Sequence, residues 1–208
     1  MLGTQHLTLF VVSGILLNLT PGQDTFYIVG RSAAQGRRAG MLSVLGIVSG
    51  SITHTLAAAF GLSAILATSA RAFLVVKFAG ACYLAYLGVT LLLDRRTGVA
   101  PSAEWSQDGG WVIYRAGFLT NLLNPKVALF FMAFLPQFVA PDAESRILTF
   151  LFLGGLFICT GTIWCLVLAW GASTMSRGLR ENPSASALLK RVTGAVFVGL
   201  GVRLAASQ

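Results

Sequence analysis

Two long runs without any charged side chain limit what this chain can fold into. One run covers residues 39–70 and the other covers residues 147–176, so they are 32 and 30 residues long. A helix needs only about 20 apolar residues to cross the hydrocarbon core of a bilayer. Charged residues make up 11% of the chain, whereas soluble domains have about 25%. The sequence therefore predicts an integral membrane protein.

The distribution of apolar segments predicts a single all-α transmembrane domain over residues 1–208. We interpret the first segment as a retained helix and not a signal peptide, because no Lys or Arg precedes Arg31 and no small-residue cleavage site is clear. Polar stretches at 94–110 and 173–187 are the long connections. Six membrane-spanning helices are expected, at residues 6–30, 39–68, 72–93, 114–136, 147–172 and 191–206.

The basic residues predict how the helices are oriented. The net charge of +8 does not indicate a nucleic-acid partner, because the bases lie in short loops between apolar segments. The odd-numbered loops hold 10 of them and the other side holds 4. By the positive-inside rule, the odd loops face the cytoplasm and both termini face the extracytoplasmic side. The ten are Arg31, Arg37, Arg38, Arg95, Arg96, Arg115, Arg177, Arg180, Lys190 and Arg191.

The two halves of the sequence resemble each other weakly. Residues 77–83 and 191–197 both read basic, apolar, small, Gly, Ala, any residue, aromatic, and an Asn shortly before a Pro occurs at 18–21 and again at 121–125. A three-helix unit repeated once gives six spans, and because three is odd the second copy is inverted. We expect repeat one at about 6–93 and repeat two at about 114–206, with a transport site where they meet.

The two prolines are predicted to lie at the same depth. Pro21 precedes Arg31 by ten residues and Pro125 follows Arg115 by ten residues. At about 1.5 Å per residue, each proline is about 15 Å from the cytoplasmic face, close to the middle of a core about 30 Å thick. Two helix breaks are therefore expected near the bilayer midplane.

Asp24 marks the candidate site, because it is the only acid in the first 93 residues. A carboxylate at membrane depth costs roughly 2.5–3.5 kcal/mol and usually faces a cavity. Pro21 removes a backbone donor and frees a carbonyl near Leu17, while Gly22 allows close approach. Unpaired backbone at this depth must line a cavity or be buried in protein. The predicted binding residues of the first break are Asn18, Thr20, Pro21, Gly22, Gln23 and Asp24.

The second break supplies a cation. Its predicted binding residues are Asn121, Asn124, Pro125 and Lys126. A Lys126–Asp24 pair would offset part of the desolvation of both groups, and Lys126 could serve only as that structural counter-ion. In the functional alternative, Asp24 binds a substrate amine or a proton, and Lys126 or a helix N-terminus binds a carboxylate. Such a site suits a small zwitterion.

Other residues give weaker signals. His54 could take part in a proton path or simply be packed, and Gly46-x-x-x-Gly50 indicates close helix packing. The three cysteines, Cys82, Cys159 and Cys165, form no C-x-x-C pair. No metal-ligand spacing, phosphate loop or nucleophile elbow is present. We therefore expect no metal, no cofactor and no enzymatic activity. The small-residue faces are compatible with a homodimer.

Several of these motifs resemble the LysE/RhtB family of amino-acid exporters. The similar stretches are residues 19–29, 35–40, 117–128 and 135–138, together with the glycine motifs of the third and sixth helices. Gln23 stands where the family has the second proline of Pro-Gly-Pro. The resemblance implies proton-motive-force-driven export of amino acids or their derivatives across a bacterial inner membrane.

Three other classes of function are weaker alternatives. An exporter of metal or other ions could share the layout, but the sequence has no cluster of membrane carboxylates or histidines. A thiol-disulfide electron carrier would need paired cysteines on the first and fourth helices, and neither has one. A membrane hydrolase would need a nucleophile–base pair, for which His54 beside a Ser or Thr is too general a signal.

Overall fold

The described part of the chain is helical. The computed structural model describes residues 3–68 and 107–174, with isolated positions between 74 and 93 and between 191 and 202. Within this part of the chain, the β-structure is one isolated antiparallel bridge between Thr4 and Val139. Apart from these isolated positions, the predicted helices 72–93 and 191–206 lie outside the described residues, as do most of both polar connections. The helices are α1 (Leu7–Leu19), α2 (Gln23–Ala57), α3 (Ser63–Thr68), α5 (Gly110–Leu122), α6 (Pro125–Leu129) and α7 (Arg146–Thr174), with π-helices η1 (Ala58–Leu62) and η2 (Phe130–Phe134) and the 3-10 helix η3 (Leu135–Phe138).

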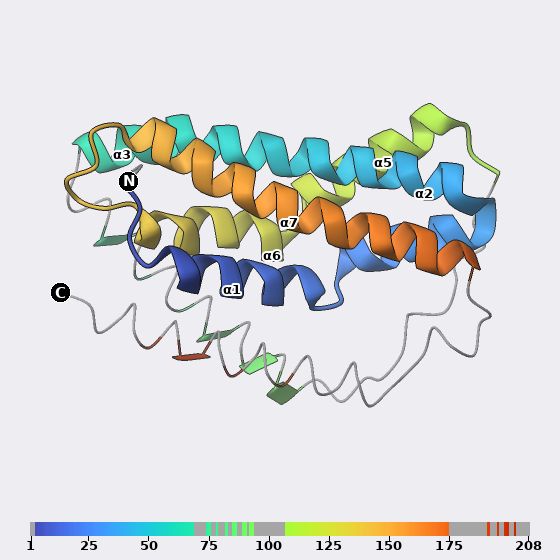
Figure 1. The fold of residues 1–208 in the computed structure, drawn as a ribbon, viewed down its shortest axis with the longest axis horizontal. Coiled ribbons are helices and arrows are strands. Elements are labelled where there is room, and N and C mark those ends of the chain that lie inside the picture. The colour runs from blue at the N-terminus through green and yellow to red at the C-terminus, as the bar shows by residue number, and fades with distance from the viewer. Residues whose placement is uncertain are drawn as a thin grey trace.

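The first predicted helix is broken, and the loop expected after it is reduced to a kink. α1 ends at Leu19 and α2 begins at Gln23, beyond the Pro-Gly pair. The connection expected at 31–38 is shorter than predicted: helix continues on both sides of a kink at Gly36, whose φ of 80° is a conformation that glycine adopts readily. Figure 1 shows the chain turning back there. Consistent with that reversal, the Ser32 hydroxyl lies against Gly40.

The fourth predicted helix, 114–136, begins earlier and is also broken. α5 starts at Gly110, and α6, η2 and η3 continue the path to Phe138 at an angle of 46° to α5. Pro125 lacks the N–H that would continue α5. Asn124 caps the new helix, because its Oδ1 accepts a hydrogen bond of 3.0 Å from the Lys126 backbone N–H. The fifth predicted helix, 147–172, is confirmed as α7.

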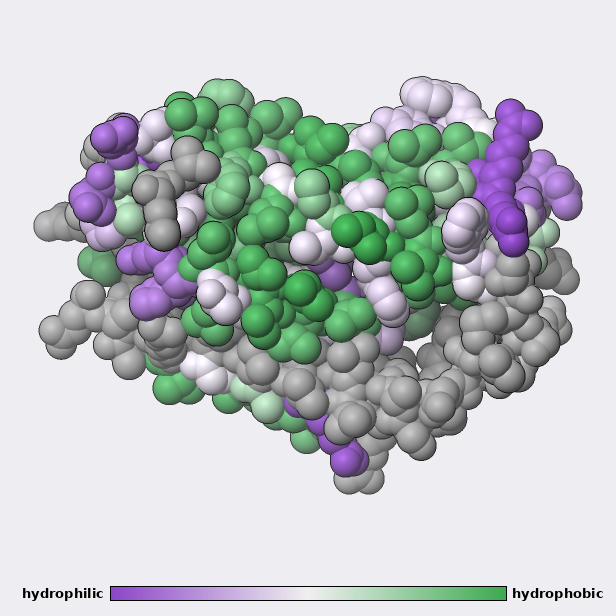
Figure 2. Space-filling view, viewed as in Figure 1, coloured by the Kyte–Doolittle hydropathy of each residue, from purple (hydrophilic) through white to green (hydrophobic). Residues whose placement is uncertain are grey.

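The lengths and surfaces of these helices fit a membrane. Gln23–Ile65 and Arg146–Ala172 are long and apolar enough to span a bilayer, and the bent pair Gly110–Leu122 and Pro125–Phe138 gives up to a third span. A straight helix over Gln23–Ile65 would be about 65 Å long, so the kink at Gly36 divides it. Figure 2 shows a broad hydrophobic band on one face, with hydrophilic residues at its two ends. Six spans and an inverted repeat stay predictions.

Glycines allow α2 to lie directly against α5 and α7. A Cβ on Gly46 would be 2.8 Å from the backbone nitrogen of Phe118, and one on Gly117 would be 2.9 Å from the carbonyl oxygen of Ser43. On the other side, Gly154 of α7 faces Thr55. The packing role predicted for Gly46-x-x-x-Gly50 is thus confirmed within the chain. A hydrophobic cluster rich in phenylalanine joins α1, η2 and α7.

Candidate functional site

The two helix breaks lie side by side. The Lys126 ammonium, in the first turn of α6, donates hydrogen bonds of 3.0 Å each to the backbone carbonyls of Leu17 and Thr20. Leu17 stands four residues before Pro21, so its carbonyl is the one that the proline leaves without a helical donor. A Cβ on Gly22 would be only 3.3 Å from the Lys126 Nζ. The sequence had predicted both the freed carbonyl and the need for a small residue here.

A second set of contacts joins the same two breaks, this time from the end of α5 to the start of α2. The Nδ2 of Asn121, at the end of α5, donates a hydrogen bond of 2.8 Å to Asp24 Oδ2, in the first turn of α2. Asn121 is itself held by Ser51, whose hydroxyl lies 3.2 Å from its Oδ1. Gly50 makes room for this side chain, since a Cβ there would be 2.7 Å from the same oxygen. Asn121 is 1% exposed, so its orientation is fixed by packing.

Asp24 and Lys126 do not form the direct salt bridge that the sequence suggested. In the part of the chain that the structure describes, the ion pair is instead Arg31–Asp108, at 2.6 Å. Lys126 uses two of its three N–H bonds on backbone carbonyls. Asp24 uses one oxygen on Asn121, and its Oδ1 is buried with no hydrogen-bond partner. Both charged groups therefore retain capacity for a ligand.

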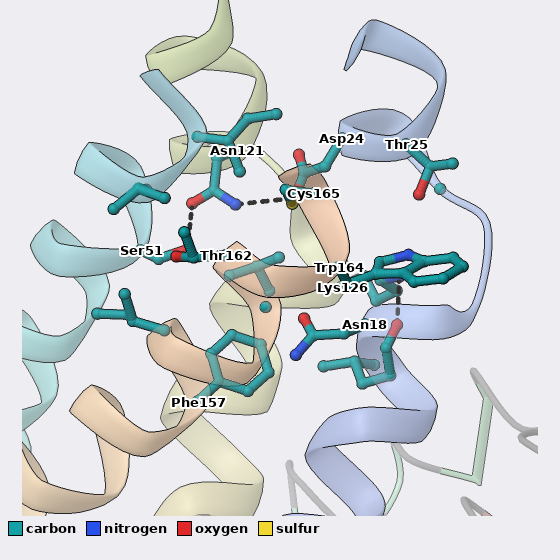
Figure 3. A pocket seen from close by; sticks show the side chains of 17 residues that line it. Asn18, Asp24, Thr25, Ser51, Asn121, Lys126, Phe157, Thr162, Trp164 and Cys165 are labelled. Atoms are coloured by element: carbon teal, nitrogen blue, oxygen red, sulfur yellow. Dashed lines mark hydrogen bonds between the residues drawn. The ribbon is translucent and has the colours of Figure 1, made fainter. Parts of the chain in front are cut away.

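These groups line a small cavity between α1, α2, α5, α6 and α7 (Figure 3). Its volume is about 40 Å³, which is room for a few water molecules, since one needs about 10–15 Å³ by this measure. An amino acid would require the walls to separate. The polar lining residues are Asn18, Asp24, Thr25, Ser51, Asn121, Lys126, Thr162, Trp164 and Cys165, and the apolar ones include Leu17, Ile47, Val48, Val127, Phe157 and Ile158.

The predicted site residues divide into two groups. Asn18, Gly22, Asp24, Asn121 and Lys126 line the cavity. The others lie around it. Thr20 is buried, and its hydroxyl donates a hydrogen bond of 2.7 Å to the Leu16 carbonyl. Asn124 is buried as the cap of α6, Pro21 is half-buried at the break, and Gln23 and Pro125 are exposed.

His54 lies behind the site and not in the cavity. Its Nε2 is 3.4 Å from the carbonyl oxygen of Asn121. This residue is four before Pro125, and its carbonyl accepts a hydrogen bond of 3.0 Å from the Asn124 N–H in place of the donor that the proline lacks. The ring stacks on Phe131 with a centroid separation of 5.7 Å. The packing alternative for His54 accounts for both contacts, and a proton path through it stays a prediction.

Sequence reasoning missed the contribution of α7. Trp164, Cys165 and Thr162 line the cavity from the long charge-free run, in which no single polar residue stands out. Ser51 was missed for the same reason. Gly161 was the available signal: it allows the Asn18 side chain to approach α7, where a Cβ would lie 3.1 Å from the Asn18 Oδ1. Among the described residues, no three His, Cys, Asp or Glu lie together as metal ligands.

Comparisons with known proteins agree on one family. The model of the family described as LysE type translocator matches residues 15–208. An uncharacterized membrane protein of Vibrio cholerae is 31% identical over 205 residues, covering 96% of each chain. The leucine efflux protein of Klebsiella pneumoniae is 26% identical over 206 residues, covering 99% of this chain and 97% of its own. No solved structure matches the chain.

Proposed function

Since this chain belongs to the LysE type translocator family, we propose that it is a secondary exporter of amino acids or small amino-acid derivatives in a bacterial inner membrane. The match to a leucine efflux protein along almost the whole chain supports this substrate class. The observation that carries the proposal is the cavity between the two breaks, which places a carboxylate and an ammonium on one small polar space.

The charges of the site match those of a zwitterion. The unpaired oxygen of Asp24 is available to accept from a substrate ammonium, or to carry a proton when the substrate is absent. Lys126 is held at the opposite break and has one N–H left to donate to a carboxylate. Charge-assisted hydrogen bonds of this kind are about twice as strong as neutral ones. Both roles use groups already fixed by neighbouring helices.

Transport requires the site to open alternately to each side. The described arrangement leaves a volume of only about 40 Å³, which is too small for an amino acid, so the helix halves that meet at the breaks would have to move apart. One proton moving through 100 mV supplies about 2.3 kcal/mol, enough for roughly a fiftyfold gradient of a neutral solute. We propose the proton motive force as the energy source.

Replacement of Asp24 tests this proposal. Cells producing the wild type or Asp24→Asn are loaded with a dipeptide mixture, and released amino acids are measured over time by mass spectrometry. The variant keeps the shape of the side chain but removes its charge, so we expect efflux to fall about ten- to a hundredfold with equal protein in the membrane. An uncoupler should abolish wild-type efflux.

Each result has a distinct meaning. Full efflux by Asp24→Asn would remove this carboxylate from the binding site. Wild-type efflux that is insensitive to the uncoupler would contradict proton coupling but not amino-acid export. If the wild type releases no amino acid above cells lacking the protein, amino-acid export is wrong, and a modified metabolite or an ion becomes the substrate to test.

A further inference from the structure

The cavity has unused hydrogen-bonding groups of both kinds. Asp24 Oδ1 is a buried acceptor without a partner, while Asn18 Nδ2 and Trp164 Nε1 are buried donors without partners. Lys126 adds one N–H beyond the two that its carbonyl acceptors use. A buried polar group left unpaired costs about 1–3 kcal/mol, and such groups are rare. Three such atoms around one space, beside an ammonium with one N–H to spare, indicate a ligand with complementary groups.

The donors gather on one side of the cavity. Asn18 follows Leu17, whose carbonyl holds the Lys126 ammonium. Its side chain packs against Gly161 of α7, and Trp164 lies three residues further on, which is the same face of the helix one turn later. In Figure 3, Trp164, Lys126 and Asn18 lie together, below Asp24 and Asn121.

The acceptor lies on the other side. Asn121 occupies Asp24 Oδ2 and leaves Oδ1 as the unpaired oxygen. A ligand that crosses from this oxygen to the three donors needs a cationic donor at one end and an anionic acceptor at the other. The α-ammonium and α-carboxylate of an amino acid provide this pair. Apolar residues such as Ile47 and Phe157 complete the lining and suit an uncharged side chain.

We infer that Trp164, Asn18 and Lys126 form the subsite for the α-carboxylate of the substrate, opposite Asp24 as the subsite for its ammonium. The inference rests on the proposed function and adds how the site selects its substrates: the indole N–H of Trp164 favours substrates with a free carboxylate. α7 therefore contributes a specificity-determining residue to a site otherwise built from the two helix breaks.

Removal of one hydrogen bond tests this role. Proteoliposomes containing wild type, Trp164→Phe or Trp170→Phe are loaded either with the twenty proteinogenic amino acids or with the corresponding α-amino amides. The amides keep the ammonium but lack the carboxylate. Release is measured by mass spectrometry over a range of internal concentrations. Trp170→Phe is the matched control, because Trp170 is on the same helix, is 64% exposed and is not among the cavity-lining residues.

We expect Trp164→Phe to raise the half-saturating concentration of the transported amino acids about tenfold with little change in maximal rate. In the same variant, transport of the amides, or inhibition by them, should change less than twofold. The ratio by which the protein prefers amino acids to their amides should therefore fall. Trp170→Phe should match the wild type. An unchanged half-saturating concentration in Trp164→Phe would overturn the inference, as would a lower maximal rate with unchanged preference. Absence of wild-type release would instead reject the proposed function.

Discussion

At the scale of single residues, the site is built from the consequences of two prolines. Pro21 and Pro125 each leave a carbonyl four residues earlier without its helical donor. Lys126 binds the first of these carbonyls, on Leu17. The second, on Asn121, accepts from the Asn124 N–H and lies near His54. The polar groups at membrane depth therefore hold the broken backbone and line the cavity at the same time.

The contacts of Lys126 give it a structural role that differs from the counter-ion role considered from the sequence. If it only neutralises Asp24, then Asp24→Asn/Lys126→Met should be as stable as the wild type. If it holds the carbonyls of Leu17 and Thr20, the double variant should stay as unstable as Lys126→Met alone. We expect the second result, a loss of about 1–3 kcal/mol, measured as the thermal unfolding midpoint in detergent.

Asp24→Asn alone is the control for this comparison. We expect it to unfold close to the wild type, because the amide oxygen introduced at this position can still accept the hydrogen bond from Asn121. Recovery of stability in the double variant would show that Lys126 acts as a counter-ion.

At the scale of helices, the two breaks contact each other reciprocally. The start of α6 reaches the end of α1 through Lys126, and the end of α5 reaches the start of α2 through Asn121. If the broken helix α1–α2 is exchanged with the broken helix α5–α6, one of these contacts takes the place of the other. Any two-fold relation between the two broken helices would give this exchange, whether its axis lies in the membrane plane or along the membrane normal, so the inverted repeat stays a prediction. The third and sixth helices of that repeat lie outside the described residues.

The close approach of α2 and α5 fixes the position of the two broken helices relative to each other. A Cβ on Gly46 would meet the carbonyl of Tyr114 and lie 2.8 Å from the Phe118 nitrogen, and backbone atoms cannot rotate away. We expect Gly46→Ala to destabilise the protein by about 1–3 kcal/mol, as overpacking does, and to reduce transport because Asn121 lies on the same helix as Phe118. Thermal unfolding in detergent provides the measurement.

Gly155→Ala is the matched control for Gly46→Ala. A Cβ at Gly155 of α7 would meet nothing within 4 Å, so this variant should unfold at or slightly above the wild-type temperature. Equal unfolding temperatures for the two variants would contradict the close-packing role of Gly46.

At the scale of the whole molecule, the structure sorts the predicted loops to two ends. Arg31, near the Gly36 kink, pairs with Asp108 before α5, and Arg37 lies 5.6 Å from the ring of Trp170, near the end of α7. At the other end, Thr4 pairs with Val139, and Gln5 Nε2 donates to the Gln137 carbonyl at 2.8 Å. The loops expected on the cytoplasmic side are thus grouped, although which side they face stays a prediction.

Cysteine labelling in intact cells tests the orientation. In a background without the native cysteines, Gly109→Cys and Glu144→Cys place one exposed thiol at each end. A membrane-impermeant maleimide should label Glu144→Cys only, because the basic loops are expected inside. Labelling after cell lysis confirms that both thiols react. Labelling of Gly109→Cys alone in intact cells would reverse the topology.

The sequence by itself determined the membrane class, the two helix breaks and most of the residues that meet at them. These features depend on local chemistry: charge-free length, the missing N–H of proline, and the rarity of Asp24 and Lys126 in apolar segments. The carbonyl freed at Leu17 was predicted in this way and is occupied in the structure. The alternation of apolar segments likewise predicted α7 closely.

Only the tertiary structure decided which polar groups face one another. Lys126 binds backbone carbonyls instead of Asp24, Asn121 binds Asp24 in its place, and Trp164 enters the cavity from a run in which no polar residue stood out. Such pairings depend on the crossing of helices far apart in the chain and on how closely glycines let them approach. The periodicity of one helix fixes which of its residues share a face, but the neighbouring helices decide what that face contacts.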